Sequence, residues 1–115
     1  MGKASRDKGA RGEREAAAVL RRLGLFPNAQ RAYHQSRDGG DAADLEGTGA
    51  LWVEVKRGKR PNIPKAWSQA AEESAGADQV PVAMTRQDRG RWLVTVAVED
   101  LKVLAMEVWA HDEEG

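Results

Sequence analysis

Three residues of this 115-residue chain, Asp44, Glu54 and Lys56, have the types and spacing needed for joint chemistry. Glu54 and Lys56 lie in residues 51–56, whose apolar and β-branched composition predicts a central strand. Strand side chains alternate between faces, so Glu54 and Lys56 share a face, opposite the hydrophobic face. A carboxylate and an ammonium on the inner part of a strand are costly unless something uses them. These residues are therefore the first candidates for a functional site.

Asp44 precedes Glu54 by ten residues, and residues 47–49 between them are turn formers. In an antiparallel hairpin centred on Gly49, Asp44 lies across from Glu54, with Cβ atoms about 5 Å apart. Centring the hairpin one residue earlier makes the pair diagonal. Two carboxylates this close repel each other, and a divalent cation removes that repulsion. Oxygen ligands alone suit a hard ion such as Mg²⁺ or Mn²⁺.

A third acidic residue, Glu13, lies on a helix predicted over residues 11–23 and ended by Gly24. Glu13 stands one turn before Ala17 and shares its face with the predicted inward stripe. The alternative is a first-turn glutamate favoured by the helix dipole. Spacing alone leaves both interpretations open. The predicted inward stripe consists of Ala16, Ala17, Leu20 and Leu23.

Length and composition favour one ordinary water-soluble domain, with 41% hydrophobic and 31% charged residues. The absence of cysteine excludes disulfides, thiolate zinc sites and cysteine nucleophiles. No apolar run approaches transmembrane length, and the N-terminus lacks the apolar segment of a signal peptide. We therefore expect a location in the cytoplasm or nucleoid.

The net charge of zero conceals two oppositely charged halves. Residues 1–60 hold 13 Lys and Arg against 8 Asp and Glu, whereas residues 61–115 hold 5 against 10. The candidate carboxylates lie in the basic half, whose other residues favour contact with a polyanion. A solvated basic surface is the alternative.

The order of predicted elements indicates a mixed α/β sheet flanked by helices, in a single domain. The last predicted helix is apolar around much of its circumference, which leaves a subunit interface and simple core packing both open. The predicted elements are a flexible basic arm (1–10), the first helix (11–23), a strand (30–35), a polar loop (36–40), the strand at 51–56, a helix from Pro64 to about Ala75, a strand (80–85), a well-buried strand (91–98), a helix (101–109) and an acidic tail (111–115).

Asp44 followed by Glu54-Val55-Lys56, with Glu13 on a preceding helix, resembles the PD-(D/E)XK nuclease superfamily. Residues 8–14 are similar to the N-terminal helix of archaeal-type Holliday junction resolvases, which carries a glutamate before an arginine. The resemblance covers about residues 8–100, and phage-encoded relatives are similar in size. Two features depart from the family: Ala43 replaces a proline, and the hairpin is short. The short hairpin makes Asp41 an alternative, but Asp44 is preferred because it faces Glu54 and precedes a hydrophobic residue.

The resemblance implies a role for each site residue. Asp44, Glu54 and the backbone carbonyl of Val55 would hold Mg²⁺ or Mn²⁺, with Glu13 contributing directly or through water. Lys56 would position or activate the attacking water. Gln69 occupies a helix position where relatives often carry a polar active-site residue, and an exposed glutamine is the alternative.

Five further polar and basic residues are candidates for DNA contact. Ser36 and Arg37 precede Asp44 in a polar loop, and Arg57, Lys59 and Arg60 directly follow the predicted strand. Phosphate contacts of this kind give affinity without sequence information. The alternative for each of them is an ordinary surface residue that does not contact DNA.

The resemblance thus implies a restriction-endonuclease-like fold over residues 11–110 and a Mg²⁺-dependent endonuclease that resolves four-way DNA junctions. Symmetric cleavage of a junction requires two active sites, which a two-fold homodimer supplies. If the chain is phage-encoded, it would act in the host cytoplasm. The alternatives are a related repair or restriction-like nuclease acting on other DNA, a non-catalytic DNA-binding dimer of the same fold, and a protein-interaction module.

Overall fold

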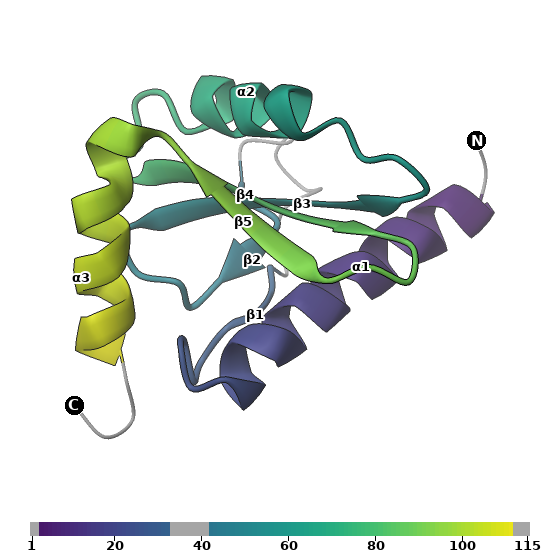
Figure 1. Cartoon of the computed structure of the whole chain (residues 1–115), viewed down its shortest axis with the longest axis horizontal. Coiled ribbons are helices and arrows are strands. Elements are labelled where there is room, and N and C mark those ends of the chain that lie inside the picture. Colours follow the sequence, from purple (N-terminus) through teal and green to yellow (C-terminus); the bar gives the residue numbers. More distant parts are fainter. Residues whose placement is uncertain (1–2, 33–41, 112–115) are drawn as a thin grey trace.

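A three-stranded mixed sheet and a two-stranded sheet, with three helices around them, make up the computed structural model, which describes residues 3–32 and 42–111 (backbone only for 3–8). Figure 1 shows α1 and α2 on opposite sides of the larger sheet and α3 beside it. No helix in the described ranges is long and apolar enough to span a membrane. The elements are α1 (Lys3–Arg22), β1 (Gln30–Arg31), β2 (Leu45–Glu46), β3 (Leu51–Gly58), α2 (Ile63–Glu73), β4 (Val80–Gln87), β5 (Trp92–Val96), a 3₁₀ turn η1 (Val98–Asp100) and α3 (Leu101–His111).

The predicted strand at residues 51–56 is confirmed as β3, and the mixed α/β sheet flanked by helices is confirmed with it. β3 runs parallel to β4, with α2 as the connection, and β4 pairs antiparallel with β5. The central strand is therefore β4, and the prediction of β3 as the central strand was wrong. Residues 51–55 of β3 are all buried, because helices cover both faces of the sheet.

The first helix begins earlier than predicted. α1 starts at Lys3, so the described part of the expected flexible arm, residues 3–10, is helical instead. Alanine, lysine and arginine dominate this stretch and are good helix formers. The helix ends at Arg22, and Gly24 follows with φ +75°, as predicted for a glycine stop. Leu23 was expected to point inward but is 60% exposed.

The predicted hairpin is only partly correct. The chain reverses at residues 47–50, with left-handed glycines at Gly47 (φ +80°) and Gly49 (φ +61°). However, β2 forms its ladder with β1 and not with β3. The link to β3 is a hydrogen bond from the Asp44 amide to the Val53 carbonyl (3.0 Å). The strand expected over residues 30–35 is β1 at its start, and residues 33–35 lie outside the described residues.

The second half of the sheet departs from prediction at its outer strand. β5 was expected to be well buried, but it lies at the sheet edge, with Leu93 and Val94 about half exposed. α3 matches the predicted last helix and packs Leu104 and Val108 against the core. α2 begins as predicted, with Pro64 in its first turn and the Asn62 side chain capping Lys65 N–H. The acidic tail lies outside the described residues, apart from His111.

Candidate active site

The predicted site residues from four separate segments line one cavity of about 400 Å³. α1 contributes Glu13, the segment before β2 contributes Asp44, and α2 contributes Gln69. β3 contributes Glu54, Val55 and Lys56. The other lining residues are Gly9, Gly12 and Arg57.

Asp44 is positioned by the backbone of the outer side of β3. The Ala50 carbonyl points to β4 and accepts a hydrogen bond from the Val80 amide. Backbone groups alternate in direction along a strand, so those of Val53 and Val55 point away from β4. Asp44 satisfies two of these groups: its amide donates to the Val53 carbonyl, and its Oδ2 accepts from the Val55 amide at 2.8 Å. The Val55 carbonyl lies on the same side of β3 as its amide. Asp44 thus supplies hydrogen-bond partners to the outer edge of β3, where β2 and β3 form no regular ladder.

Glu54 points from β3 toward α2. Its Oε2 accepts from the Gln69 side-chain amide at 2.8 Å, and the residue is only 3% exposed. Its other carboxylate oxygen, Oε1, is buried and has no hydrogen-bond partner among the described residues. A buried carboxylate oxygen without a donor is unfavourable, so this position calls for a positively charged ligand.

Burial raises the pKa of both carboxyl groups. The pKa of Asp44 rises to about 7, mainly through desolvation, with nearby Glu13 adding to the effect and the Val55 amide opposing it. The pKa of Glu54 rises to about 8, again through desolvation first, then through Asp44 and Glu73. Lys56 lies near enough to both groups to oppose these shifts, but it does not cancel them. The site is therefore short of positive charge when both carboxyl groups ionise.

The donor set fits a hard cation. Asp44, Glu54 and the Val55 carbonyl offer only oxygen atoms, as Mg²⁺ and Mn²⁺ prefer. The Glu13 side chain lies beside Asp44, and its Oε1 also forms an ion pair with Arg31 Nε at 2.7 Å, which balances its charge. Within residues 3–32 and 42–111, no three acidic, histidine or cysteine side chains are close enough to hold a metal unaided. Two carboxylates and a carbonyl are thus the direct ligands that this arrangement offers, with water left to complete the shell.

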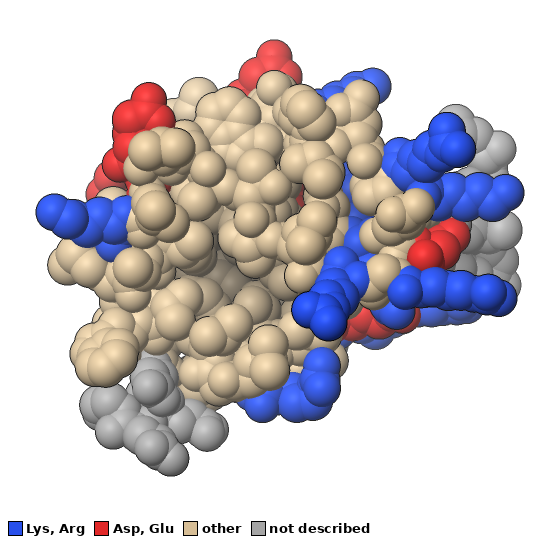
Figure 2. Space-filling model, viewed as in Figure 1, with Lys and Arg blue, Asp and Glu red and all other residues tan. Residues whose placement is uncertain are grey.

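A second cavity, of about 420 Å³, adjoins the acidic one and shares Lys56, Arg57 and Gln69 with it. Its wall adds Lys59, Arg60 and Lys65, all exposed. Among the described residues, these three side chains form no ion pairs. Figure 2 shows Lys and Arg gathered at the end of the molecule where α1 begins. We call Lys59, Arg60 and Lys65 the cationic groove.

Arg57 was predicted to contact DNA, but its side chain is already engaged. Its Nε lies 3.1 Å from Glu15 Oε1, close enough for an ion pair although not aligned for a hydrogen bond. Arg86 contacts the same Glu15 oxygen at 3.2 Å, and Asp88 lies 4.0 Å from Arg57. Arg57 therefore ties α1 to β3 and β4. Ser36 and Arg37 lie outside the described residues.

Two residues of this region were missed by sequence reasoning. The Gln69 Nε2 that contacts Glu54 also lies 3.2 Å from Glu73 Oε2, one helical turn further along α2. The spacing of four residues on a helix could have indicated Glu73 once Gln69 was suspected. Lys65 lies in the first turn of α2, and its position after the basic cluster was the available signal.

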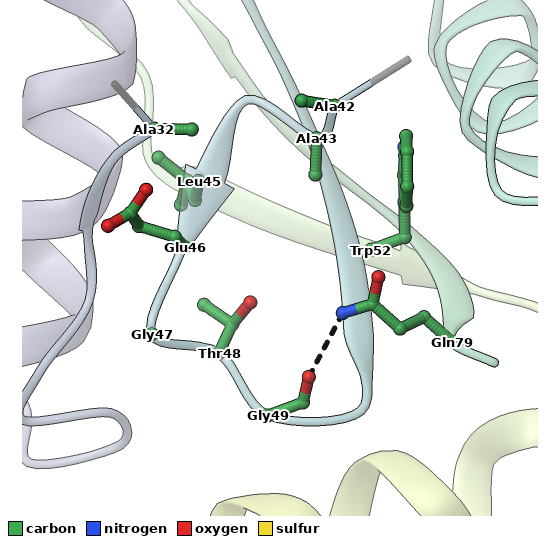
Figure 3. Close-up of a pocket in the computed structure, with 10 residues that line it drawn as sticks. All are labelled: Ala32, Ala42, Ala43, Leu45, Glu46, Gly47, Thr48, Gly49, Trp52 and Gln79. Atoms are coloured by element: carbon green, nitrogen blue, oxygen red, sulfur yellow. Dashed lines mark hydrogen bonds between the residues drawn. The ribbon is translucent and has the colours of Figure 1, made fainter. Parts of the chain in front are cut away.

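A different cavity, of about 310 Å³, lies near the start of β3 (Figure 3). Gln79 lines this cavity, and its side-chain amide donates to the Gly49 carbonyl at 3.1 Å. Glu46 is the one charged residue among those that line it. Unlike the acidic cavity, this wall has neither paired carboxylates nor a cation.

Known proteins assign no family to this chain, so its function is argued from the geometry of the site. No protein-family model matches the chain, and no curated protein matches it significantly.

Proposed function

We propose that this protein is a metal-dependent DNA endonuclease of the PD-(D/E)XK type, with a restriction-endonuclease-like fold. One observation carries the proposal: two carboxylates with raised pKa values, Glu54 buried and Asp44 partly buried, share a cavity with Lys56, and this cavity opens into the cationic groove. Carboxylates that lack a counter-charge suit a divalent cation, and a row of lysine and arginine side chains suits a phosphate backbone.

Asp44, Glu54 and the Val55 carbonyl would hold the cation, and Glu13 would act through water. A cation bound there lowers the pKa of its water and neutralises the phosphate. Lys56 is exposed and lines the cavity, and its ammonium would hold the attacking water and donate to the charge that develops on the phosphate oxygens. The Val55 amide and the Gln69 amide fix the orientations of Asp44 and Glu54.

The cationic groove would hold the DNA backbone next to the cleavage position. Lys59, Arg60 and Lys65 are exposed, and their contacts with phosphate would give affinity without reading sequence. Arg57 would contribute by fixing the wall between the two cavities, because its charge is shared with Glu15 and Asp88.

We further propose that the substrate is a four-way DNA junction, cut by a symmetric homodimer. Support comes from the similarity of residues 8–14 to the resolvase helix and from the place of Glu13 in the cavity wall. A small domain that would contact phosphates, and whose described residues include no evident groove-reading helix, is expected to recognise the shape of branched DNA.

The proposal is tested by cleavage of a four-way junction and of a linear duplex of the same sequence, with Mg²⁺, Mn²⁺ or EDTA. We expect metal-dependent cleavage of the junction and a loss of at least about 100-fold for Glu54→Gln. Glu72→Gln, an exposed neighbour on α2, is the matched control and should cleave normally.

The outcomes separate the two parts of the proposal. Equal cleavage of linear duplex would retain the nuclease and remove the junction preference. Unchanged cleavage by Glu54→Gln would remove the acidic cavity from the mechanism, and no cleavage with either metal would remove the enzyme.

A further inference from the structure

A cavity of about 180 Å³ lies between α1, α3 and one face of the larger sheet. Leu20 of α1 and Leu104 of α3 line it from the two helices, and Val53, Met84 and Val94 line it from the three strands. Figure 2 shows this side of the molecule, where the surface between α3 and α1 is hollowed and uncharged. We call this cavity the apolar pocket.

The apolar pocket offers no free polar side chain to a ligand. Its one hydroxyl belongs to Thr48 and already donates to the Leu51 carbonyl at 3.0 Å. The other lining residues are leucine, valine, methionine and phenylalanine. A cavity lined by such side chains stays dry, and one of about 150 Å³ takes a benzene ring. The apolar pocket therefore has room for one large apolar group.

A larger cleft, of about 740 Å³, lies between α1 and the turn that joins β4 to β5. Three arginines line this cleft, Arg22, Arg86 and Arg91, against one carboxylate, that of Glu15. Arg86 contacts Glu15 at 3.2 Å, whereas the exposed Arg22 and Arg91 form no ion pair among the described residues. The cleft thus carries a surplus of positive charge, and we call it the arginine cleft.

The arginine cleft and the apolar pocket adjoin each other along the two elements that they share. On α1, Leu23 of the cleft stands one turn from Leu20 of the pocket. On β5, Trp92 of the cleft and Val94 of the pocket are two residues apart and point to the same face of the sheet. Leu93 points to the opposite face and lines neither. The two hollows form one crevice, cationic at one end and apolar at the other.

β5 borders this crevice as an edge strand without the usual protection against pairing. Within the described residues its one ladder partner is β4. Its sequence, Trp-Leu-Val-Thr-Val, contains no charge and no proline. Edge strands of monomers normally carry a lysine, a proline or a bulge that prevents pairing with another chain. An extended peptide added to such an edge places alternate side chains in the pockets beside it.

We propose that the crevice and the edge of β5 bind an extended acidic segment of a partner protein by strand addition. One large apolar side chain of the segment fills the apolar pocket, and a carboxylate two residues away meets Arg22 and Arg91. A nucleic-acid backbone also carries negative charge, but it has no peptide groups to pair with β5 and no apolar side chain for the pocket. The inference goes beyond the nuclease activity and stands independently of it.

The test uses the full chain and a labelled synthetic peptide, Glu-Glu-Thr-Phe-Thr-Glu-Glu, without metal, so that binding is measured apart from cleavage. The peptide has the same pattern in both directions and suits either orientation of the added strand. We expect a Kd of roughly 10–100 μM by fluorescence anisotropy, and slower amide exchange along β5. Replacing the phenylalanine with alanine should weaken binding about 10–100-fold, as expected for one buried aromatic side chain.

Two charge-reversal variants locate the binding site. Arg22→Glu with Arg91→Glu changes two exposed side chains of the arginine cleft and should weaken peptide binding by about tenfold or more. Lys59→Glu with Arg60→Glu makes the same change of charge in the cationic groove and should bind the peptide as the wild type does. A peptide with lysine in place of glutamate should not bind.

Several results would overturn the proposal. They are no saturable binding of the glutamate peptide up to about 1 mM, equal binding of the lysine peptide, and equal weakening by the two charge-reversal variants. Sedimentation of a dimer that excludes the peptide would assign the edge to a second copy instead. Oligothymidylate binding that Arg22→Glu with Arg91→Glu abolishes, in place of peptide binding, would assign the cleft to nucleic acid. A protein that binds the peptide but cleaves no DNA would support this inference and remove the proposed nuclease.

Discussion

The two outer strands of the larger sheet, β3 and β5, each have an energetically unfavourable feature, and the two features are opposite in kind. At the β3 edge, the buried carboxylate of Glu54 lies near the partly buried Asp44, and its Oε1 has no donor among the described residues. Along β5 and α3, hydrophobic side chains are exposed to water. Buried charge is relieved by a cation, whereas exposed apolar surface is relieved by a protein surface. The two edges therefore call for different kinds of partner.

We expect the carboxyl groups at the β3 edge to make the free energy of unfolding depend on pH, whereas β5 should not. The folded-state pKa values of Asp44 and Glu54, about 7 and 8, lie above their ordinary values, so the folded state binds more protons. Their contribution to stability is therefore full below about pH 4 and is lost as pH rises through 7 and 8. At pH 8.5 without metal, Glu54→Gln should raise the free energy of unfolding by on the order of 1–3 kcal/mol, and the unfolding midpoint by about 5 °C or more.

Thermal unfolding at pH 5 and pH 8.5 checks this prediction. Glu99→Gln, which changes an exposed carboxylate in η1, should shift neither midpoint. Mg²⁺ should stabilise the wild type at pH 8.5 more than at pH 5. If Glu54→Gln were less stable than the wild type at pH 8.5, the electrostatic account of the β3 edge would be wrong.

A smaller effect is expected from Glu73, which contacts the same Gln69 amide as Glu54 does. Glu73→Met removes an acceptor that holds Gln69, and should lower kcat by about tenfold with little change in KM. Glu73→Gln retains an acceptor oxygen and should restore most of the rate. Cleavage kinetics on the junction, with Glu72→Met as control, measure the difference. Equal rates for the Met and Gln variants of Glu73 would assign it no positioning role.

The smallest effect concerns the cationic groove. Lys59→Ala and Lys65→Ala should each reduce the slope of log binding constant against log salt concentration by about one. Lys102→Ala, on the outward side of α3, should leave the slope unchanged. Arg57→Ala should instead lower stability, because it breaks the contacts with Glu15 and Asp88. Filter binding across a salt series tests the slopes, and an equal loss for Lys102→Ala would mean that the groove is not the DNA path.

The sequence predicted well those features that local patterns determine. Residues 51–56 alternate strictly enough to set which side chains share a face. Glycine marked the C-terminal end of α1, and proline marked the start of α2. The acidic cavity followed from the same alternation, because Glu54 and Lys56 point away from the hydrophobic side of β3.

Features that depend on distant segments were predicted less well. β2 pairs with β1, which a turn at Gly49 does not reveal. β5 has the continuous apolar composition of a buried strand, but its exposure depends on whether another layer covers it. Arg57 could not be distinguished from the cations beside it, because its partners Glu15 and Asp88 are remote in sequence.

The most direct test of the central claim is a titration of the metal-free protein with Mn²⁺ at pH 8.5, followed by electron paramagnetic resonance. The wild type should bind Mn²⁺, and the double variant Asp44→Asn, Glu54→Gln should bind at least about 100-fold more weakly, whereas Glu72→Gln should bind as the wild type does. Binding of equal strength by the double variant, or none by the wild type, would contradict the account.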